Sequence, residues 1–472
     1  MALPDLIEIV PLEKPVRAEI TVPGSKSITN RALILAALAD GEVTLQGALW
    51  SEDTEIMFDC LQKLGFQVRQ ENDPAELCNR TLTVVGQGGR VPPGGTETQP
   101  LDLFVGNAGT AARFLAPFLC LGSGVYRLHG VARMHERPQA ALFSALRELG
   151  YRVESENGND KLPVKIWGKA ESGKRKAETS CKVSIAESSQ FASALLLSAK
   201  HGGWEIEIVG ENADESPYVA MTSKLMEAFP KKGGTFQIEP DASSGSYFVG
   251  AGWLLNQYEF FLSREAKIEL AQIKLSDVSV RLWPDSRWQM DEAFIELTRI
   301  GILAFDDVAD MESIQLVLSP LNFSRNADLG DSIMTQIALS PVLRWGLKEA
   351  TFTDLGRLRV QECERVVALR TELTKCGAKV VEEGDTLTVG PSQLHGAEIE
   401  TYNDHRMAMC FAILGLKVPG IKIKNPACVK KTFPNFFQKL AAAPPHGLGA
   451  EIWEIKDGWR TRQLSGDDLF AD

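Results

Sequence analysis

Cysteine and histidine are scarce and scattered in this sequence. Its 472 residues include eight cysteines, none in a CxxC pair, and six histidines, none in an HExxH pattern. These spacings argue against a zinc ribbon, a disulfide framework and any metal site, and they predict a reduced, cytoplasmic compartment. The pattern GxxxxGK[ST] is also absent, which argues against a P-loop nucleotide site.

Long apolar runs and excess positive charge are missing as well. The longest apolar run, Met407 to Leu416, is too short to cross a membrane, and the N-terminal residues carry no signal-peptide pattern. Lys and Arg number 50 against 62 Asp and Glu, so the net charge is −12. This balance argues against a nucleic-acid partner, and an anionic small substrate would need a cationic pocket gathered locally.

An α/β unit of roughly 70 residues recurs six times along the chain. Each copy begins with a helix of small and apolar residues, continues with an alternating strand, and closes with an amphipathic helix, often near LxxLG. The copies begin near Arg31, Thr110, Gln190, Asp241, Ser332 and His405. A generic α/β enzyme also alternates helices and strands, but the recurring LxxLG ending favours true repeats.

Two segments do not fit the repeat. Leu262 to Arg287 lengthens the fourth copy, and the tail after Ala441 predicts one more strand and a frayed end. Neither segment indicates a function.

Polar clusters occur where the apolar helices begin. PGSKSITNR places Lys26 and Arg31 near the positive end of a helix dipole, which suits an anion. VGNAGTAARF leaves backbone N–H groups exposed before a helix, with Arg113 one turn inside. In RMHERPQ, Pro138 suits a first helical turn and so places Arg137 at a helix start. Each cluster alone is equally explained by a helix cap or a tight turn.

Other clusters combine acids with cations. Asp331 stands in LGDSIMT, while Glu362 and Arg365 are three residues apart and are expected to meet on one helical face. TYNDHRMAMCF sets Asp404, His405 and Arg406 directly before a strongly apolar helix, which is costly unless these groups are paired or functional.

The clusters gain meaning together, because they sit at the same place in successive repeats. If the helix N-termini converge on a cleft, the cations build a dense pocket for substrates with several phosphate and carboxylate groups. These cations are Lys26, Arg31, Arg113, Arg137, Arg365, Arg406 and Lys431.

In this order along the chain, the motifs PGSKSITNR, GNAGTAARF, ERP, SSQF, DASSGSYF, VQECER, YNDHRMAMCF and KTFP resemble the 5-enolpyruvylshikimate-3-phosphate (EPSP) synthase family. The resemblance extends to Leu440. It implies a two-domain inside-out α/β barrel of six βαβ-type repeats, three per domain, with residues 1–21 and 245–472 in one domain and 22–244 in the other. It implies a monomer without metal or organic cofactor.

The implied reaction transfers the enolpyruvyl group of phosphoenolpyruvate to the 5-hydroxyl of shikimate 3-phosphate and releases phosphate. The family is the target of glyphosate and serves aromatic amino acid biosynthesis. The catalytic residues that the resemblance implies are Lys26, Asp331, Glu362 and His405. Those that bind shikimate 3-phosphate are Lys26, Ser27, Arg31, Ser188, Ser189, Gln190, Tyr218 and Asp331. Those that bind phosphoenolpyruvate are Lys26, Asn107, Gly109, Arg137, Gln190, Arg365, Arg406 and Lys431.

The sequence departs from the family pattern at several positions. Gln361 replaces a common Lys of the shikimate-phosphate site, and we predict that Arg357, four residues earlier, binds the phosphate in its place. Glu215 replaces a Ser near the PY motif. The other departures are Phe114 for Pro, Met290 for Gly and Glu364 for Asp or Asn.

Two competing interpretations follow. The first, UDP-N-acetylglucosamine enolpyruvyl transferase, is disfavoured because RMHERP lacks that family's catalytic Cys and because KSITNR is present. The second is a non-catalytic binder of an anionic metabolite. Asp331 and Glu362 speak against it, because an anion binder gains nothing from carboxylates in its pocket.

Overall fold

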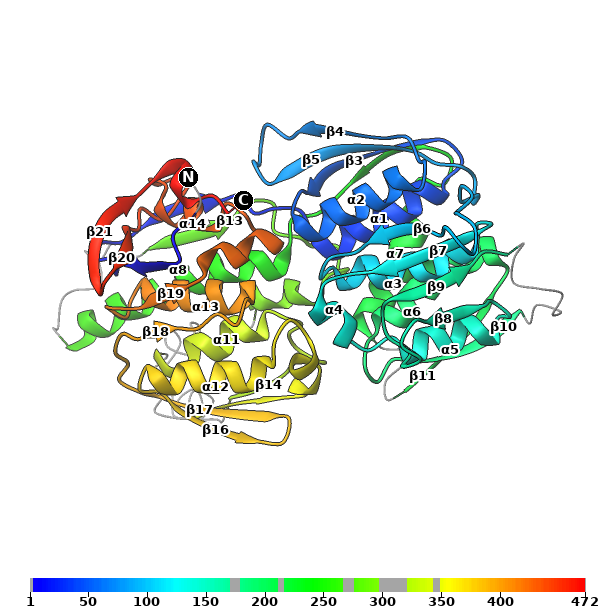
Figure 1. Ribbon diagram of the computed structural model, residues 1–472. Coiled ribbons are helices and arrows are strands. Elements are labelled where there is room, and N and C mark those ends of the chain that lie inside the picture. The colour runs from blue at the N-terminus through cyan, green and yellow to red at the C-terminus, as the bar shows by residue number, and fades with distance from the viewer. Residues whose placement is uncertain are drawn as a thin grey trace. The chain divides into compact units, whose positions relative to one another are not determined.

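The chain divides into two compact units, which Figure 1 shows. The terminal unit comprises Met1–Val22 with Pro240–Asp472 and contains both ends of the chain, and the middle unit is Pro23–Glu239. The computed structural model describes residues 3–169, 179–210, 216–265, 276–296, 321–342 and 349–471, with the backbone alone for 256–265. In these ranges no helix is long and apolar enough to cross a membrane.

The described part of the middle unit contains three sheets. Its strands are β3 (Glu42–Leu49), β4 (Val68–Asn72), β5 (Asn79–Val85), β6 (Leu101–Phe104), β7 (Val125–His129), β8 (Val153–Ser155), β9 (Val164–Trp167), β10 (Ser180–Ser184), β11 (Glu205–Val209) and β12 (Gly234–Gln237). The sheet orders are β12-β3-β5-β4, β6-β7-β9-β8 and β10-β11. In each sheet the first two strands run parallel, and the remaining neighbours are antiparallel.

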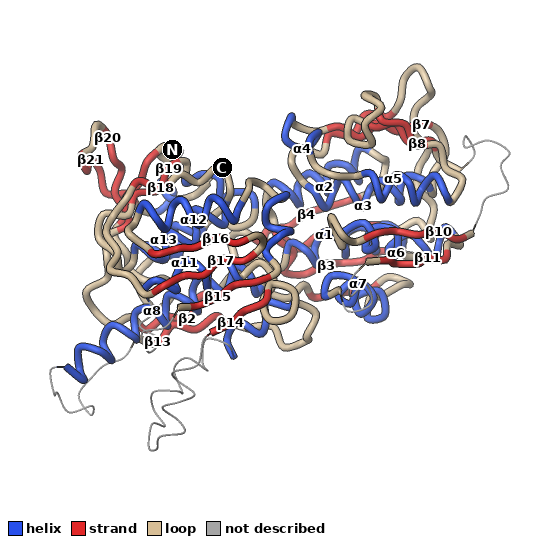
Figure 2. Tube along the Cα trace, turned by 90° about the horizontal axis from the view of Figure 1, so that it is seen from below, coloured by secondary structure: helices blue, strands red, loops and turns tan. Residues whose placement is uncertain are grey.

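The terminal unit repeats this arrangement in its described residues. Its strands are β1 (Leu6–Ile9), β2 (Arg17–Ile20), β13 (Asp277–Val280), β14 (Leu321–Ser324), β15 (Ala350–Thr353), β16 (Lys379–Glu383), β17 (Thr386–Gly390), β18 (Glu398–Ile399), β19 (Lys422–Lys424), β20 (Ile452–Lys456) and β21 (Trp459–Leu464). The sheet β14-β15-β17-β16 has the order and directions of β6-β7-β9-β8, and its four strands lie side by side in Figure 2. The other two sheets, β13-β2 and β18-β19-β1-β20-β21, also contain one parallel pair each. The fold is therefore mixed α/β.

Helices of two kinds accompany the sheets. Those of the middle unit are α1 (Lys26–Leu38), α2 (Glu52–Lys63), α3 (Gly109–Cys120), α4 (Ala132–Glu136), α5 (Ala140–Glu148), α6 (Gln190–Gly202) and α7 (Pro217–Ala228). The apolar helices α1, α3 and α6 pack on one another, and every residue of α3 is buried, as expected of a helix that is apolar all round. Helix α2 buries one face only and carries a Ser51–Thr54 capping box at its start.

The helices of the terminal unit follow the same plan. They are α8 (Ala242–Glu265), α11 (Ile333–Leu339), α12 (Arg365–Lys375), α13 (His405–Gly415) and α14 (Phe436–Ala441). Short 3₁₀ helices are η2 (Met290–Ala293), η3 (Ser340–Val342), η4 (Leu355–Val360), η5 (Pro426–Lys431) and η6 (Gly466–Leu469). Helices α8, α11 and α13 pack together and bury an apolar core shared with β1, β15 and η5.

Several local predictions are confirmed. The segment EVTLQGAL forms β3 over its full length, and the helices expected near Arg31, Thr110, Gln190 and His405 begin at Lys26, Gly109, Gln190 and His405. Other predictions fall partly outside the described residues, namely the insertion Leu262 to Arg287 and the helix that closes the fourth copy.

Three local predictions are wrong. Arg137 does not start a helix: it follows the short α4, and α5 begins only at Ala140. Glu362 does contact Arg365, but it precedes α12 instead of lying on it. The tail forms two strands, not one, and its end is buried at Leu469 and Ala471.

The tail is held in place because its strands β20 and β21 extend the sheet that contains β1. Buried apolar residues and an ion pair with β1 stabilise it there. Arg460 of β21 donates two hydrogen bonds of 2.9 Å to the carboxylate of Glu8, which lies on β1. The Arg460 guanidinium holds the pKa of Glu8 below its ordinary value, although burial acts in the opposite direction. Leu464 and Ile452 face each other across the hairpin and are buried.

Candidate active site

The start of α1 is set by close backbone packing. A Cβ on Gly24 would lie 2.0 Å from the carbonyl oxygen of Gly47, which sits at a register shift between β3 and β5, so only glycine fits. The next residues follow from this contact: Ser25 donates its N–H to Glu239, and Lys26 opens the helix. The Nζ of Lys26 lies 3.1 Å from Asp53 of α2, and the lysine side chain keeps 18% of its surface exposed.

Arg31 is the most deeply buried cation among the described residues of the middle unit. Its Nε donates to Thr222 Oγ1 at 2.8 Å, and its Nη2 donates to Ser193 Oγ at 3.1 Å. Its guanidinium also lies 5.0 Å from the ring centre of Phe114, a cation–π distance. Among the described residues no carboxylate lies within 4.0 Å of it. Burial lowers the pKa of Arg31 to about 10, so the group remains charged at neutral pH.

Two further cations, Arg137 and Arg113, lie near the start of α3. A Cβ on Gly109 would lie 2.7 Å from Nη2 of Arg137, so the glycine lets this guanidinium approach the helix N-terminus. Arg137 also donates to the carbonyl of Asn107 at 3.1 Å. Arg113 is held by the side-chain oxygen of Gln190, at 2.6 Å. Positive charge at a helix N-terminus is unfavourable without an anion, so this arrangement could accommodate one.

Short hydroxyl side chains lie at the starts of α6 and α7. Ser188 accepts the N–H of Gln190, Ser189 is buried at the N-cap of α6, and Tyr218 lies in the first turn of α7. The hydroxyl of Ser216 is buried and has no hydrogen-bond partner within the described chain. Glu215 lies outside the described residues. We refer to the groups around Arg31, Arg137 and these hydroxyls as the Arg31 cluster.

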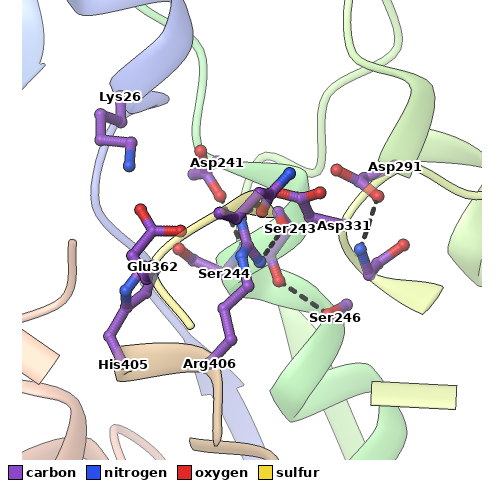
Figure 3. Close-up of polar contacts among 12 residues, drawn as sticks. Lys26, Asp241, Ser243, Ser244, Ser246, Asp291, Asp331, Glu362, His405 and Arg406 are labelled. Carbon is purple, nitrogen blue, oxygen red and sulfur yellow. Dashed lines mark hydrogen bonds and ion pairs between the residues drawn. The ribbon is translucent and has the colours of Figure 1, made fainter. Parts of the chain in front are cut away.

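The terminal unit gathers a second group around Asp331, which we call the Asp331 cluster; Figure 3 labels Asp331, Glu362, His405 and Arg406 of this group. The carboxylate of Asp331 lies 2.7 Å from Nη2 of Arg325, 3.2 Å from Nη2 of Arg406 and 3.8 Å from Nη1 of Arg365. Burial alone would raise the pKa of Asp331, but these three cations outweigh it and hold the pKa well below its ordinary value. Asp331 is therefore ionised throughout the neutral range.

Glu362 lies between two cations. Its Oε2 accepts from Arg365 Nη2 at 2.8 Å, and its Oε1 lies 3.0 Å from Lys431 Nζ. Its side chain is only 10% exposed. Lys431 comes from η5, which places it opposite the start of α12. The Glu362 carboxylate is therefore held between two cations, one from each of two separate elements.

Arg365 connects the acids of this cluster. Its Nε donates to Asp404 at 2.7 Å, and its Nη1 donates to the amide oxygen of Gln361. Gln361 therefore contacts the guanidinium that also holds Glu362. The side chain of Arg365 is 1% exposed, and its acidic neighbours raise its pKa against the effect of burial.

The start of α13 supplies Arg406 and His405. Asp404 caps this helix by accepting the N–H of Arg406 at 2.9 Å. The Arg406 guanidinium reaches Ser243 at 2.5 Å and Tyr247 at 3.4 Å, both on α8. His405 is buried, with Nδ1 3.8 Å from Asp404 Oδ1.

A further acid, Asp291, contacts the residues on either side of Asp331. It accepts the N–H of Ser332 at 2.9 Å, and a Cβ on Gly330 would meet it at 2.9 Å. Burial and the charge of Asp331 raise its pKa. Within the described chain no group of His, Cys, Asp and Glu side chains is arranged to hold a metal ion.

The structure thus gathers many of the predicted residues into two clusters, one in each unit, whereas Arg357 lies on η4 and Lys26 pairs with Asp53. Sequence reasoning missed the groups that hold them in place, which are Asp53, Ser193, Thr222, Ser243, Tyr247, Asp291 and Arg325. None stands in a charged motif with its partner. Only Arg325 carried a signal in the sequence, because it is a cation six residues before the acid Asp331 that it contacts.

Comparison with known proteins decides the family. The sequence model described as EPSP synthase (3-phosphoshikimate 1-carboxyvinyltransferase) matches residues 10–440. The chain belongs to the EPSP synthase family. The 3-phosphoshikimate 1-carboxyvinyltransferase of Trichormus variabilis is 35% identical, over 92% of this chain and 98% of that protein. The protein of the same name from Opitutus terrae is 36% identical, over 93% and 98%.

Solved structures agree with the fold. The EPSP synthase of Acinetobacter baumannii superposes with a TM-score of 0.61 at 19% identity, covering 95% of this chain and all of that one. The enolpyruvyl transferase NikO of Streptomyces tendae gives a TM-score of 0.58 at 15% identity, covering 95% and 98%. Membership of the EPSP synthase family fits a site made of clustered cations with acids between them.

Proposed function

We propose that this chain transfers the enolpyruvyl group of phosphoenolpyruvate to the 5-hydroxyl of shikimate 3-phosphate and releases inorganic phosphate. The observation that carries the proposal is the position of Glu362, a nearly buried acid between Arg365 and Lys431. Both substrates are anionic, and the reaction needs an acid among anion-binding groups. A simple anion binder would gain nothing from that carboxylate.

Shikimate 3-phosphate is assigned chiefly to the Arg31 cluster. Lys26, Ser27 and Arg31 bind its hydroxyls and carboxylate, while Ser188, Ser189, Gln190 and Tyr218 surround its ring and phosphate. Arg31 supports this assignment because it is fixed by hydroxyl groups and retains a full charge for an incoming anion. Arg357 and Gln361 are assigned to the phosphate, and Asp331 to the attacking hydroxyl.

Phosphoenolpyruvate is assigned to the remaining cations. Arg365, Arg406 and Lys431 bind it in the terminal unit, and Asn107, Gly109, Arg137, Lys26 and Gln190 bind it in the middle unit. The close approach of Arg137 to Gly109 supports this, because it combines a guanidinium with the N-terminus of α3 at one place.

The chemistry is an addition followed by an elimination. Glu362 donates a proton to the methylene carbon, which makes the adjacent carbon electrophilic, and the 5-hydroxyl oxygen attacks that carbon. Asp331 accepts the hydroxyl proton, which later passes to the departing phosphate, and the positive charge of Lys26 assists this transfer. In the second step the C–O bond to phosphate breaks, the new methyl group returns a proton to Glu362, and the Arg and Lys side chains stabilise the departing phosphate. We assign His405 a further proton-handling role.

Substrate binding itself prepares Asp331 for this role. In the free chain Arg406 and Arg365 depress its pKa, which makes it a weak base. Anions bound to these guanidinium groups cancel part of their charge, so the pKa of Asp331 rises toward the range where it accepts a proton.

The proposal includes the architecture of the family. We infer an inside-out barrel of six βαβ-type repeats, three in each domain, and a monomer that acts on small molecules in the cytoplasm. The parallel strand pairs of the described sheets and the packed helices α1, α3 and α6 support the repeat.

A phosphate-release assay with both substrates tests the function. The chain should release phosphate only when both are present, and Glu362→Gln should lower kcat by roughly 10²-fold, the usual effect of removing a general acid. Glu364→Gln is the matched control, since Glu364 pairs with Arg359 and caps α12. No release by the parent chain would favour the non-catalytic interpretation, and release with UDP-N-acetylglucosamine would favour the other transferase.

A further inference from the structure

Glu372 is a buried carboxylate that the proposed reaction does not use. It lies on α12, seven residues after Arg365, and its side chain is fully buried. Its Oε1 accepts the hydroxyl hydrogen of Tyr402 at 2.8 Å. Its Oε2 accepts the N–H of Glu400 at 3.1 Å and lies 2.5 Å from Nζ of Lys375. Two of these three contacts hold the segment that leads into α13.

That segment is a strained turn. Tyr402 and Asn403 both have positive φ, 53° and 55°, and Asp404 donates its N–H to the carbonyl of Thr401 at 2.8 Å. Two central residues with positive φ and this hydrogen bond are the features of a type I′ turn, which prefers Asn and Gly. A tyrosine in this conformation is unfavourable, so the surrounding structure must hold it there.

The residues directly after the turn belong to the Asp331 cluster. Asp404 pairs with Arg365 and caps the helix from which Arg406 reaches Asp331. Helix α12 therefore holds this segment at two places, through Arg365 at its first residue and through Glu372 two turns later.

We propose that the Glu372–Tyr402 contact is a clamp that positions Asp404, His405 and Arg406 for phosphoenolpyruvate. Glu372 and Tyr402 are positioning residues, because they act through the turn and not on the substrate. The role of the clamp in turnover rests on the proposed function, whereas its effect on the turn does not. The negative charge of Glu372 keeps the Tyr402 hydroxyl protonated, because burial and this carboxylate raise its pKa.

Two substitutions at Tyr402 separate positioning from plain stability. Tyr402→Phe removes the hydroxyl but keeps the side chain that makes the turn strained. Tyr402→Gly removes the hydroxyl and the strain together. Tyr402 is 39% exposed, so Tyr402→Phe keeps its packing, and Tyr402→Gly loses only the contacts of a partly exposed ring. Tyr126→Phe is the matched control, because its buried hydroxyl donates to Pro92 at 2.7 Å on the middle unit.

The kinetic expectation distinguishes the variants. Tyr402→Phe should lower kcat/KM for phosphoenolpyruvate about tenfold, the effect of losing one hydrogen bond to a charged group, and leave KM for shikimate 3-phosphate unchanged. Tyr402→Gly should lose less, roughly threefold or under, because glycine adopts the turn without the clamp. Tyr126→Phe should change neither parameter. Glu372→Gln, which keeps an oxygen acceptor but not the charge, should lie between the parent and Tyr402→Phe.

Hydrogen exchange provides a readout that does not need turnover. The backbone N–H of Arg406 donates a hydrogen bond to the side chain of Asp404. Exchange of this N–H should therefore be faster in Tyr402→Phe and unchanged in Tyr126→Phe. Parent-like exchange and kinetics in Tyr402→Phe would overturn the proposal, as would a larger kinetic loss in Tyr402→Gly than in Tyr402→Phe. If the parent chain releases no phosphate, the proposed function fails, and the exchange of Arg406 alone decides whether the clamp exists.

Discussion

Replacing Asp404 by asparagine should weaken the terminal unit more than its single lost charge suggests. Asp404 is fully buried and receives Nε of Arg365 at 2.7 Å and its Nη2 at 3.3 Å. Asparagine preserves the shape of the side chain and its cap of α13, since asparagine is also a good N-cap. The substitution therefore removes mainly the ion pair.

The magnitude follows from what Arg365 retains. Removing one partner of a buried ion pair costs about 3–5 kcal/mol when the other charge is left without compensation. Arg365 keeps Glu362 at 2.8 Å and Asp331 at 3.8 Å, so we expect a smaller loss of about 2–3 kcal/mol in the free energy of unfolding. Asp404→Ala should cost about 1 kcal/mol more, because it also removes the helix cap.

Native-state hydrogen exchange of the buried α13 amides measures this loss in the terminal unit alone. Glu398→Gln is the matched control: the same carboxylate-to-amide change is made in an ion pair of 2.7 Å with Lys424, but both side chains are 44% exposed. Exposed pairs contribute little, so the control should stay near the parent. A loss in Asp404→Asn no larger than in Glu398→Gln would refute the reasoning.

Three further predictions concern the clusters. Asp331→Asn should reduce stability most above about pH 4, and the difference from the parent should shrink as pH falls. The reason is that the pKa of Asp331 is depressed in the folded state from its usual value of about 3.9. Unfolding titrations at several pH values test this, and a constant difference would contradict it. Phe114→Leu should weaken shikimate 3-phosphate binding several-fold, because it removes a cation–π contact of roughly 0.5–2 kcal/mol to Arg31, and calorimetric titration measures the change against unaltered phosphoenolpyruvate binding. Arg357→Ala should weaken shikimate 3-phosphate by roughly 2–3 kcal/mol, whereas Gln361→Lys should strengthen it or leave it unchanged; parent-like affinity in Arg357→Ala would show that Arg357 does not replace the missing lysine.

Individual strands and helices could be predicted from the sequence, because they depend mainly on the pattern of neighbouring residues. The alternation of EVTLQGAL predicts β3, and the apolar runs after Lys26, Gly109, Gln190 and His405 predict the helices that start there. The motifs also identified the family, since they preserve the residues of one site in one order. The same reasoning misplaced Arg137 because a proline marks a helix start only to within a few residues.

Only the tertiary structure decided how the charges are paired. Arg31 is fixed by Ser193 and Thr222, which lie 162 and 191 residues away, and Asp331 shares its cations with Arg406 of a different helix. Hydrophobic periodicity specifies which face of a helix is buried, but it carries no information about which distant side chain that face will meet. The sequence alone predicted many of the elements, the family and the candidate site residues, whereas packing of α1, α6, α7, α12 and α13 determined their burial, their partners and the direction of their pKa shifts.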